Sequence, residues 1–381
     1  MALYLSLKEM WRNRARFLLF SMVIALITTL VLFTAALGEG LGLGNREYIE
    51  KLNADVLVYR KNVDLFIGAS RIDRSNLIKI RRVAGVQDIG SINVANVSLL
   101  LDQDRKLNIA LIGVEPGHPG EPPVVTGQGL QTTHGREAII DRDVALRTNL
   151  KVGDEFRIRS IQGTLEELYT LRVAGISDGR LYFLQPSVFV PFLTWEQIKP
   201  GGPAADSGDS SANVVAVRAA AGVSVAELSG RLSREVPDIQ AVDLKTAYEA
   251  APGYTAQQST LGTQRAFVLL IGVLVIGGFF QIQTLQKVPQ IGMLKAIGAA
   301  NATIGLAAVI QTVLVTAAGV AIGSLGTLLL SLSFPPTIPI VFTLDAVALS
   351  IVSLMLIGPL GGLVSVYYSL RVEPLTALGL S

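Results

Sequence analysis

The sequence predicts an integral membrane protein with four transmembrane α-helices and a large α+β extracytoplasmic domain inserted between the first and second helices. Charged residues make up only 16% of the 381 residues, whereas about 25% is usual in soluble proteins. Uncharged apolar segments of about 20 residues, long enough to cross a bilayer, occur at both ends of the chain. Between them, residues 38–265 form a polar segment with short β-rich and helical patterns.

The N-terminal segment, residues 1–16, places apolar side chains at helical spacing among lysine and arginine residues. This pattern predicts a cytoplasmic amphipathic helix in the headgroup plane of an anionic membrane face; a simple positive flank is the alternative. Residues 17–37 are free of charge and predict the first span. A cleaved signal peptide would have a shorter apolar core, of about 7–15 residues.

Small residues at helical spacing predict close helix contacts inside the membrane. Ser21, Ala25 and Thr29 form such a row in the first span. Two GxxxG pairs, Gly319/Gly323 and Gly358/Gly362, lie in the third and fourth spans.

The segment 38–265 is rich in short runs of Val, Ile and Leu bounded by turn residues, which predicts strands. Its mixture of short strands and helices predicts an α+β domain. We read the glycine series from Gly38 to Gly44 as a flexible exit from the first span, and 115–136 and 200–212 as loops. The predicted strands are 54–59, 94–101, 107–114, 156–161, 171–176 and 214–218, and the predicted helices are 76–83, 141–148 and 224–235.

The C-terminal third alternates apolar and polar segments. Pro359 is expected to kink the last span. The predicted segments are the second span 266–285, a cytoplasmic coupling loop 286–302, the third span 303–332, a short extracytoplasmic loop 333–345, the fourth span 346–370 and a cytoplasmic tail 371–381.

Lysine and arginine in the short flanks set the expected orientation. They gather in 1–16, 286–302 and 371–381, whereas the loop 333–345 contains none. Four spans with both termini in the cytoplasm satisfy this distribution. We therefore expect a multi-pass protein of the bacterial plasma (inner) membrane, with the lipid bilayer as its surroundings.

The coupling loop has the pattern of a short amphipathic helix. Pro289 suits its first turn, because the missing N–H would be unpaired there, and Gly298 suits its end. Ile291, Leu294 and Ile297 recur every three residues and predict one apolar face. We expect this helix to contact a cytoplasmic partner. Its predicted contact residues are Pro289, Gln290, Ile291, Gly292, Met293, Leu294, Lys295, Ala296, Ile297 and Gly298.

Enzymatic motifs are missing from the sequence. There is no Gly-Lys dipeptide and hence no Walker A phosphate loop, so we expect no enzyme and no catalytic residue. The two histidines, His118 and His134, and the absence of cysteine are too few ligands for a metal site. We expect no metal, no cofactor on this chain and no nucleic-acid partner.

The predicted spans hold no ionisable residue, which argues against a transporter driven by protons or sodium. Glu39 lies just beyond the first span, and Tyr48 follows it. Glu39 reads either as an interfacial anchor in water or as a polar contact for a substrate that enters sideways between spans. Tyr48 is a second candidate for such a contact.

The loop sequence IGMLKAIGAANATI resembles the signature that MacB/FtsX-like permeases of ABC transporters carry between their second and third spans. The usual preceding acid is Gln290 here. The start LKEMWRNR, the end RVEPLTAL and the stretch EAIIDRDVALRTNLKVGDEFRI also resemble this family. GLGLGNREYIEKLNADVLVYRK and the later SRI are most similar to its DevC/HrtB-type branch.

The resemblance implies a homodimer that binds two copies of a separate ABC ATPase, where ATP and Mg²⁺ would be bound. It implies export or extraction of a hydrophobic or amphipathic substrate, and an adaptor or other outer partner for some members. The alternative is an FtsX-like mechanotransmission subunit that moves no substrate and regulates an extracytoplasmic partner. A membrane-tethered binding protein without an ATPase is a third reading, but it leaves the amphipathic loop unexplained.

Overall fold

The computed structural model describes residues 8, 11–101, 105–162, 165–200, 211–251, 253–298, 300–334 and 338–371, with only the backbone of 362–371. The chain divides into two compact units. We call residues 1–41 with 257–381 the membrane unit and residues 42–256 the outer unit. The boundaries between them fall within one helix, at Leu41, and near the start of another, at Gln257.

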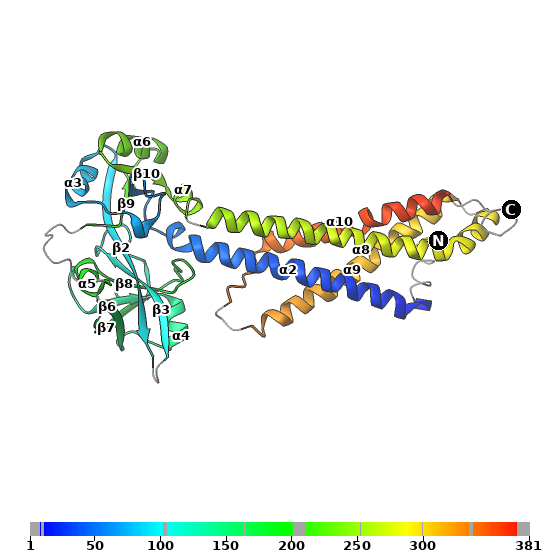
Figure 1. The fold of residues 1–381 in the computed structure, drawn as a ribbon, viewed down its shortest axis with the longest axis horizontal. Coiled ribbons are helices and arrows are strands. Elements are labelled where there is room, and N and C mark those ends of the chain that lie inside the picture. The colour runs from blue at the N-terminus through cyan, green and yellow to red at the C-terminus, as the bar shows by residue number, and fades with distance from the viewer. Residues whose placement is uncertain are drawn as a thin grey trace. The chain divides into compact units, whose positions relative to one another are not determined.

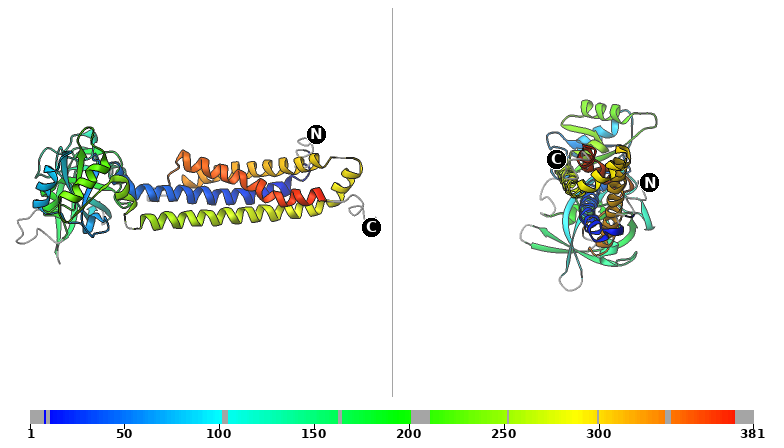
Figure 2. Two further views of the ribbon diagram at one scale, coloured as in Figure 1. Left: turned by 90° about the horizontal axis from the view of Figure 1, so that it is seen from above. Right: turned by 90° about the vertical axis from the view of Figure 1, so that its right-hand side faces the viewer.

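Among its described residues, the membrane unit contains four helices that are each long and apolar enough to cross a membrane. They lie alongside one another (Figures 1 and 2). The predicted architecture of four spans, with the large domain inserted between the first and second, is confirmed. The helices are α2 (Arg14–Glu50), α8 (Tyr254–Ala296), α9 (Asn301–Ser331) and α10 (Leu344–Arg371).

Helices α2 and α9 touch through small residues. A Cβ added at Gly323 would lie 2.5 Å from the Ala25 carbonyl oxygen, and one at Gly319 would lie 2.5 Å from the Ile24 Cβ. Thr29 Oγ1 donates to the Gly323 carbonyl at 3.1 Å. The predicted small-residue row of the first span therefore packs on the predicted glycine pair of the third.

The second glycine pair behaves differently. Gly358 packs against Thr316 of α9, and the neighbouring Gly361 meets Gly277 of α8. The surroundings of Gly362 lie outside what the structure describes. Pro359 lies inside α10.

The expected flexible exit from the first span is wrong, because α2 continues as a helix through the glycine series to Glu50. The glycines allow close approach instead. A side chain at Gly40 would collide with the backbone of Pro339, and one at Gly44 would collide with Leu184.

The prediction of a separate short helix that begins at Pro289 is also wrong. Helix α8 runs without a break to Ala296 and contains Pro289 in its interior. A proline there removes one backbone hydrogen bond but does not have to end the helix when the flanking turns are well formed. Gly298 follows the helix with φ +97°, and its N–H donates to the Lys295 carbonyl at 3.0 Å, which confirms the predicted helix end.

The outer unit contains one ten-stranded mixed sheet in the order β10-β1-β9-β2-β3-β8-β5-β7-β4, with β6 paired to β2 and β7. The strands are β1 (Val56–Arg60), β2 (Val86–Leu100), β3 (Lys106–Val114), β4 (Val124–Gly127), β5 (Glu137–Ile140), β6 (Glu155–Gln162), β7 (Leu165–Ser177), β8 (Ser187–Pro191), β9 (Val214–Ala219) and β10 (Ile239–Asp243). The helices and turns on this sheet are η1 (Ile67–Ala69), α3 (Arg74–Arg82), α4 (Arg142–Thr148), α5 (Phe192–Ile198), α6 (Val225–Glu235) and α7 (Leu244–Glu249).

The six predicted strands and three predicted helices of this region are confirmed in kind, although the strand predicted at 94–101 covers only the second half of β2. The predicted loop 115–136 contains β4, and most of the predicted loop 200–212 lies outside the described residues. Helix α6 begins at Ser224, whose side chain accepts from the Glu227 N–H as predicted.

The outer end of α2 is held within the outer unit by a charge network. The Lys51 ammonium group contacts Glu47 at 2.7 Å and Asp178 at 3.5 Å. The buried Arg180 donates to Asp178 at 2.8 Å and also to the Lys51 carbonyl. The segment that leads to β8 is therefore fixed to the last turns of α2.

Candidate functional site

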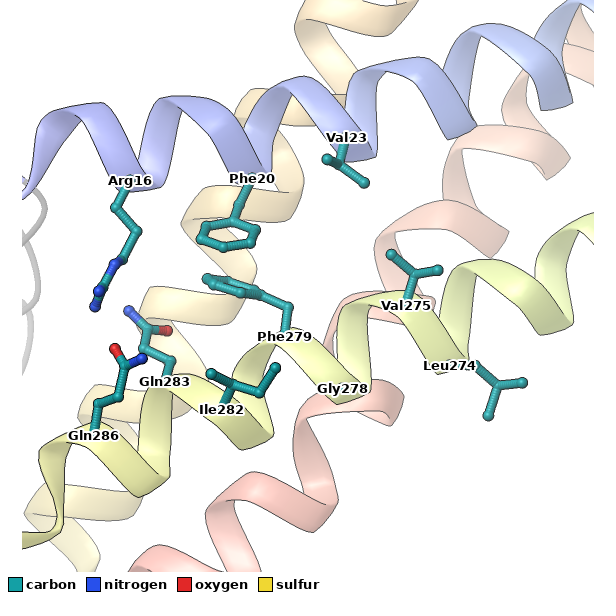
Figure 3. A pocket seen from close by; sticks show the side chains of 10 residues that line it. All are labelled: Arg16, Phe20, Val23, Leu274, Val275, Gly278, Phe279, Ile282, Gln283 and Gln286. Carbon is teal, nitrogen blue, oxygen red and sulfur yellow. The ribbon is translucent and has the colours of Figure 1, made fainter.

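A groove of about 480 Å³ lies between α2 and α8 within the membrane unit. Figure 3 shows how its side chains lie. They come from the first turns of α2 and from the middle of α8. The lining residues are Arg16, Phe20, Val23, Leu274, Val275, Gly278, Phe279, Ile282, Gln283 and Gln286.

The polar members of the groove gather at one end. Arg16, Gln283 and Gln286 point toward one another there (Figure 3). Gln283 is buried, with 4% of its surface exposed. This end therefore offers a guanidinium group and two amides, which suit an anionic or hydrogen-bonding group.

The rest of the groove is apolar. The Phe20 and Phe279 rings stack across it, and a Cβ added at Gly278 would meet nothing within 4 Å. Glycine at that position therefore leaves space that a larger residue would fill. An amphipathic molecule with an acidic head and an apolar body matches this division.

The sequence analysis did not predict this groove, although the sequence of α8 contains a pattern that indicates it. Val275, Phe279, Gln283 and Gln286 follow one another at helical spacing along one face of α8. Glutamine side chains on such a face of an apolar span are energetically unfavourable unless they have a hydrogen-bonding partner. Their presence on this face could therefore have indicated the site.

The end of α8 exposes large apolar side chains. Met293, Leu294 and Ile297 are 54%, 43% and 79% exposed. By contrast, Ile291 and Gly292 are buried against the membrane unit. Within the predicted apolar face, Ile291 is therefore buried, whereas Leu294 and Ile297 are exposed. A repeat of three residues drifts around a helix of 3.6 residues per turn, which explains the divergence.

The other predicted contact residues lie around these. Pro289, Gln290, Ala296 and Gly298 are exposed, and Lys295 is half-buried. One turn earlier, the Lys287 ammonium group donates to Gln311 of α9 at 3.2 Å. The segment 289–298 thus presents an apolar surface with a cation, and its coupling role stays a prediction.

Of the two predicted substrate-access residues, Glu39 is half-buried on α2. Tyr48 is 1% exposed and packs against Tyr182 and Phe189 in the core of the outer unit. The role of both residues in substrate access stays a prediction.

The two histidines have partners of their own. His118 Nδ1 lies 2.9 Å from an Asp88 carboxylate oxygen, and His134 Nε2 lies 2.9 Å from the Gln197 amide. Within the part of the chain that the structure describes, no group of three or more histidine or carboxylate side chains is arranged to hold a metal ion.

Comparison with known families covers nearly the whole chain. A family model described as a MacB-like periplasmic core domain matches residues 17–235. A second, described as FtsX-like permease C-terminal, matches residues 266–374. The first match includes the first span and most of the outer unit, and the second includes the three later spans.

Similar proteins include one named as a hemin transport system permease, HrtB, of Staphylococcus haemolyticus. It is 24% identical over 98% of this chain and 99% of its own length. A protein of the same name from Staphylococcus epidermidis is 22% identical over the same shares. A solved structure, the periplasmic region of MacB from Actinobacillus actinomycetemcomitans, aligns with a TM-score of 0.36 and 14% identity, over 52% of this chain and 94% of that region.

The core-domain model alone spans more than half of the sequence, and the permease model accounts for the three C-terminal spans. The chain belongs to the MacB/FtsX-like family of ABC transporter permeases.

Proposed function

We propose that this chain couples ATP hydrolysis on a separate ABC ATPase to the export or extraction of an amphipathic, anionic substrate. The observation that supports this proposal most directly is that α8 carries both of the surfaces that this function needs, one for a substrate and one for the ATPase. It lines the amphipathic groove through Leu274 to Gln286 and exposes an apolar end at Met293, Leu294 and Ile297.

The permease component of an ABC transporter is not itself an enzyme, and the family works with an ATPase partner. In our proposal the segment 289–298 binds that ATPase. Exposed apolar side chains that sit beside a cation are typical of a protein-binding surface. This assignment requires segment 289–298 and both termini to be cytoplasmic and residues 38–265 to be extracytoplasmic, as the charge distribution favours.

The groove supports the proposed substrate class. The Arg16 end would bind a carboxylate or phosphate, and the Phe20 and Phe279 rings would contact an apolar body. The relatives named as hemin permeases make hemin one member of this class to test. The ten lining residues include no His, Cys, Met or Tyr, so hemin would be held there through its carboxylates and ring edge rather than through its iron.

Two copies of the chain, each with one ATPase, form the proposed complex. We keep the domain limits proposed from the sequence, with spans at 17–37, 266–285, 303–332 and 346–370. The third of these spans extends one residue beyond the end of α9 at Ser331.

The coupling proposal is tested by Leu294→Asp, which places a charge on the exposed apolar end of α8. We expect the variant to insert into the membrane normally but to lose co-purification with the ATPase in mild detergent. Leu344→Asp is the matched control, because Leu344 is 88% exposed at the first residue of α10. Normal recovery of the ATPase with Leu294→Asp would disprove the coupling role of this segment.

A second candidate, mechanotransmission without transport, is favoured by the charge network that joins Glu47 and Lys51 of α2 to Asp178 and Arg180. Such a network would carry movement of α2 into the outer domain. The two functions differ in what changes the ATPase rate of the purified complex. A transported amphipathic anion should change it if the chain is a transporter, whereas only a protein partner of the outer domain should change it if the chain is a mechanical transmitter.

A further inference from the structure

A polar pocket of about 270 Å³ lies in the outer unit, at the point where two strands separate. Strands β2 and β6 pair only through residues 98–100 and 157–159. Beyond Arg159, β6 leaves β2 and continues along β7 to Gln162. The pocket opens at this separation, and all of its lining residues belong to the outer unit.

A row of polar side chains crosses three strands at the pocket. Ser98 of β2 lies opposite Asn108 of β3 on one side and Arg159 of β6 on the other, and residues paired in this way share a face of the sheet. Asn96 lies on the same face, two residues before Ser98. These four residues line the pocket together with Gln185, from the segment before β8. The pocket therefore presents three amides, a hydroxyl and a guanidinium group.

The pocket carries little net charge. Arg159 is the charged residue that lines it, and Nη1 of its guanidinium group lies 2.6 Å from a Glu166 carboxylate oxygen. The other polar lining groups are uncharged donors and acceptors. An uncharged ligand with many hydrogen-bonding groups therefore suits the pocket better than an ion does.

Two buried polar atoms of the lining residues have no hydrogen-bond partner among the residues that the structure describes. They are Arg159 Nε, which is a donor, and Gln185 Oε1, which is an acceptor. Most buried polar groups in proteins are hydrogen-bonded, and each exception needs an explanation. A ligand whose groups can both accept and donate would satisfy both atoms.

The side chains around these atoms extend from fixed backbone. The Gln185 N–H donates to the Tyr182 carbonyl at 3.0 Å, and the Gln185 carbonyl accepts from the Tyr182 N–H at 2.9 Å. The exposed Asn108 accepts from Ser98 Oγ through its Oδ1 at 3.3 Å, which leaves its amide N–H groups for a ligand. The exposed Asn96 amide offers both a donor and an acceptor.

Apolar surface completes the pocket. Val97, Ile161 and Pro200 supply it, and Ile161 is 53% exposed. The C–H groups of a sugar ring could contact this surface while its hydroxyl groups meet the amides. Small-molecule sites usually measure about 300–1,000 Å³, so a pocket just below that range suits a single ring.

We propose that this pocket binds one ring of a saccharide through its hydroxyl groups. A hydroxyl group is a donor and an acceptor at once, so it matches Arg159 Nε, Gln185 Oε1 and the asparagine amides alike. The ring can belong to a free sugar or to a longer chain of sugars, since both present the same hydroxyl groups. The inference does not depend on the proposed substrate or ATPase.

The test uses the full chain in nanodiscs of phosphatidylcholine, so that no detergent with a sugar headgroup is present. Glucose, N-acetylglucosamine and the linear tetramer of each are titrated, and saturation-transfer difference NMR gives the dissociation constant. We expect Asn108→Ala to raise that constant by about 3- to 10-fold, because hydrogen bonds to the ring are lost. Asn53→Ala is the matched control, since Asn53 is an exposed asparagine of the same unit outside the pocket.

Gln185→Met adds a second readout with the opposite sign. It replaces an unpaired buried oxygen with an apolar group of similar length, so the unfolding temperature of the sugar-free chain should rise. Sugar binding should weaken by the same factor of about 3 to 10. A role of Gln185 in packing alone would not move stability and binding in opposite directions.

Tighter binding of a tetramer than of its monomer would support the proposal with a sugar polymer as the source, and equal binding would support it with a free sugar. Absence of transfer to all four sugars would overturn the proposal. Binding that is unchanged in both variants would also overturn it, as would transfer to the peptide trialanine and to none of the sugars. If Gln185→Met fails to fold, Asn108→Ala decides.

Discussion

At the scale of single residues, Asp141 shows how the outer domain is held together. Its side chain is fully buried. One carboxylate oxygen accepts from the Val144 N–H at 2.6 Å at the start of α4, and the other accepts from the Ser187 N–H at 2.8 Å at the start of β8. A single carboxylate therefore joins a helix to a strand that lies far away in sequence.

Burial raises the pKa of Asp141 to about 7, and the two N–H donors oppose that rise. Because this pKa lies above the ordinary value, the fold favours the protonated form. Its contribution to stability is complete below about pH 4 and is lost as pH rises through about 7. We expect Asp141→Asn to remove part of the decrease in unfolding temperature of the full chain between about pH 5 and pH 8.

Asp243 provides the control for this prediction. It also begins a helix, α7, but hydrogen bonding to Thr246 lowers the pKa of its carboxyl group. Its contribution is present above the ordinary pKa and is lost only in more acidic solution. Asp243→Asn should therefore leave the slope between pH 5 and pH 8 unchanged, and a slope altered equally by both variants would contradict the role given to Asp141.

At the scale of elements, the contact between α2 and α9 depends on the absence of side chains. We expect Gly323→Ala to destabilise the membrane unit by about 1–3 kcal/mol, because its methyl group would meet the backbone of α2 and force the helices apart. Gly326→Ala on the same helix is the control, since its Cβ would lie 3.5 Å from Thr29 in ordinary contact. Thermal unfolding in detergent of both variants measures the difference, and equal unfolding temperatures would contradict the tight packing.

Elements with a strong local pattern could be predicted from the sequence, and those fixed by distant partners could not. The spans, β3 and α6 follow from apolar length, β-rich composition and a capping residue. Strands β5 and β8 are only four and five residues long, and each depends on pairing with a remote strand: β5 with β7, and β8 with β3. The glycine series and Pro289 were misread because local propensity suggests a break where packing maintains a helix.

The candidate sites likewise have a part that the local sequence predicts and a part that depends on distant contacts. The segment 289–298 could be located from its charges and spacing, but the inward turn of Ile291 depends on contacts across the membrane unit. The groove requires Arg16 of α2 to lie near Gln283 and Gln286 of α8, positions more than 260 residues apart in the sequence. A pattern within a short stretch of sequence cannot predict that these residues lie close together.

At the scale of the whole molecule, the groove can be tested through the ATPase cycle. We expect Arg16→Gln to raise the half-maximal concentration at which an amphipathic carboxylate or phosphate stimulates the ATPase by at least about 10-fold, because one charge-assisted hydrogen bond contributes about 1.5–3 kcal/mol. Assembly with the ATPase should be unaffected.

Arg12→Gln is the control for this prediction, because Arg12 is exposed one turn earlier and does not line the groove. An Arg16→Gln complex with unchanged concentration dependence would show that the anionic head does not bind at this end. A loss of assembly would instead show that Arg16 is structural.

The proline inside α8 has a mechanical consequence. Without an N–H at position 289, the carbonyl of Leu285 has no helical partner there, so the helix is more compliant at this turn than on either side of it. The last turns, which carry Met293 and Leu294, can then bend to follow a docked protein while the turns that line the groove keep their shape. Under the proposed coupling role of segment 289–298, such a joint would transmit a push along the helix axis and yield to sideways bending, so that mainly the axial part of an ATPase stroke would reach the membrane.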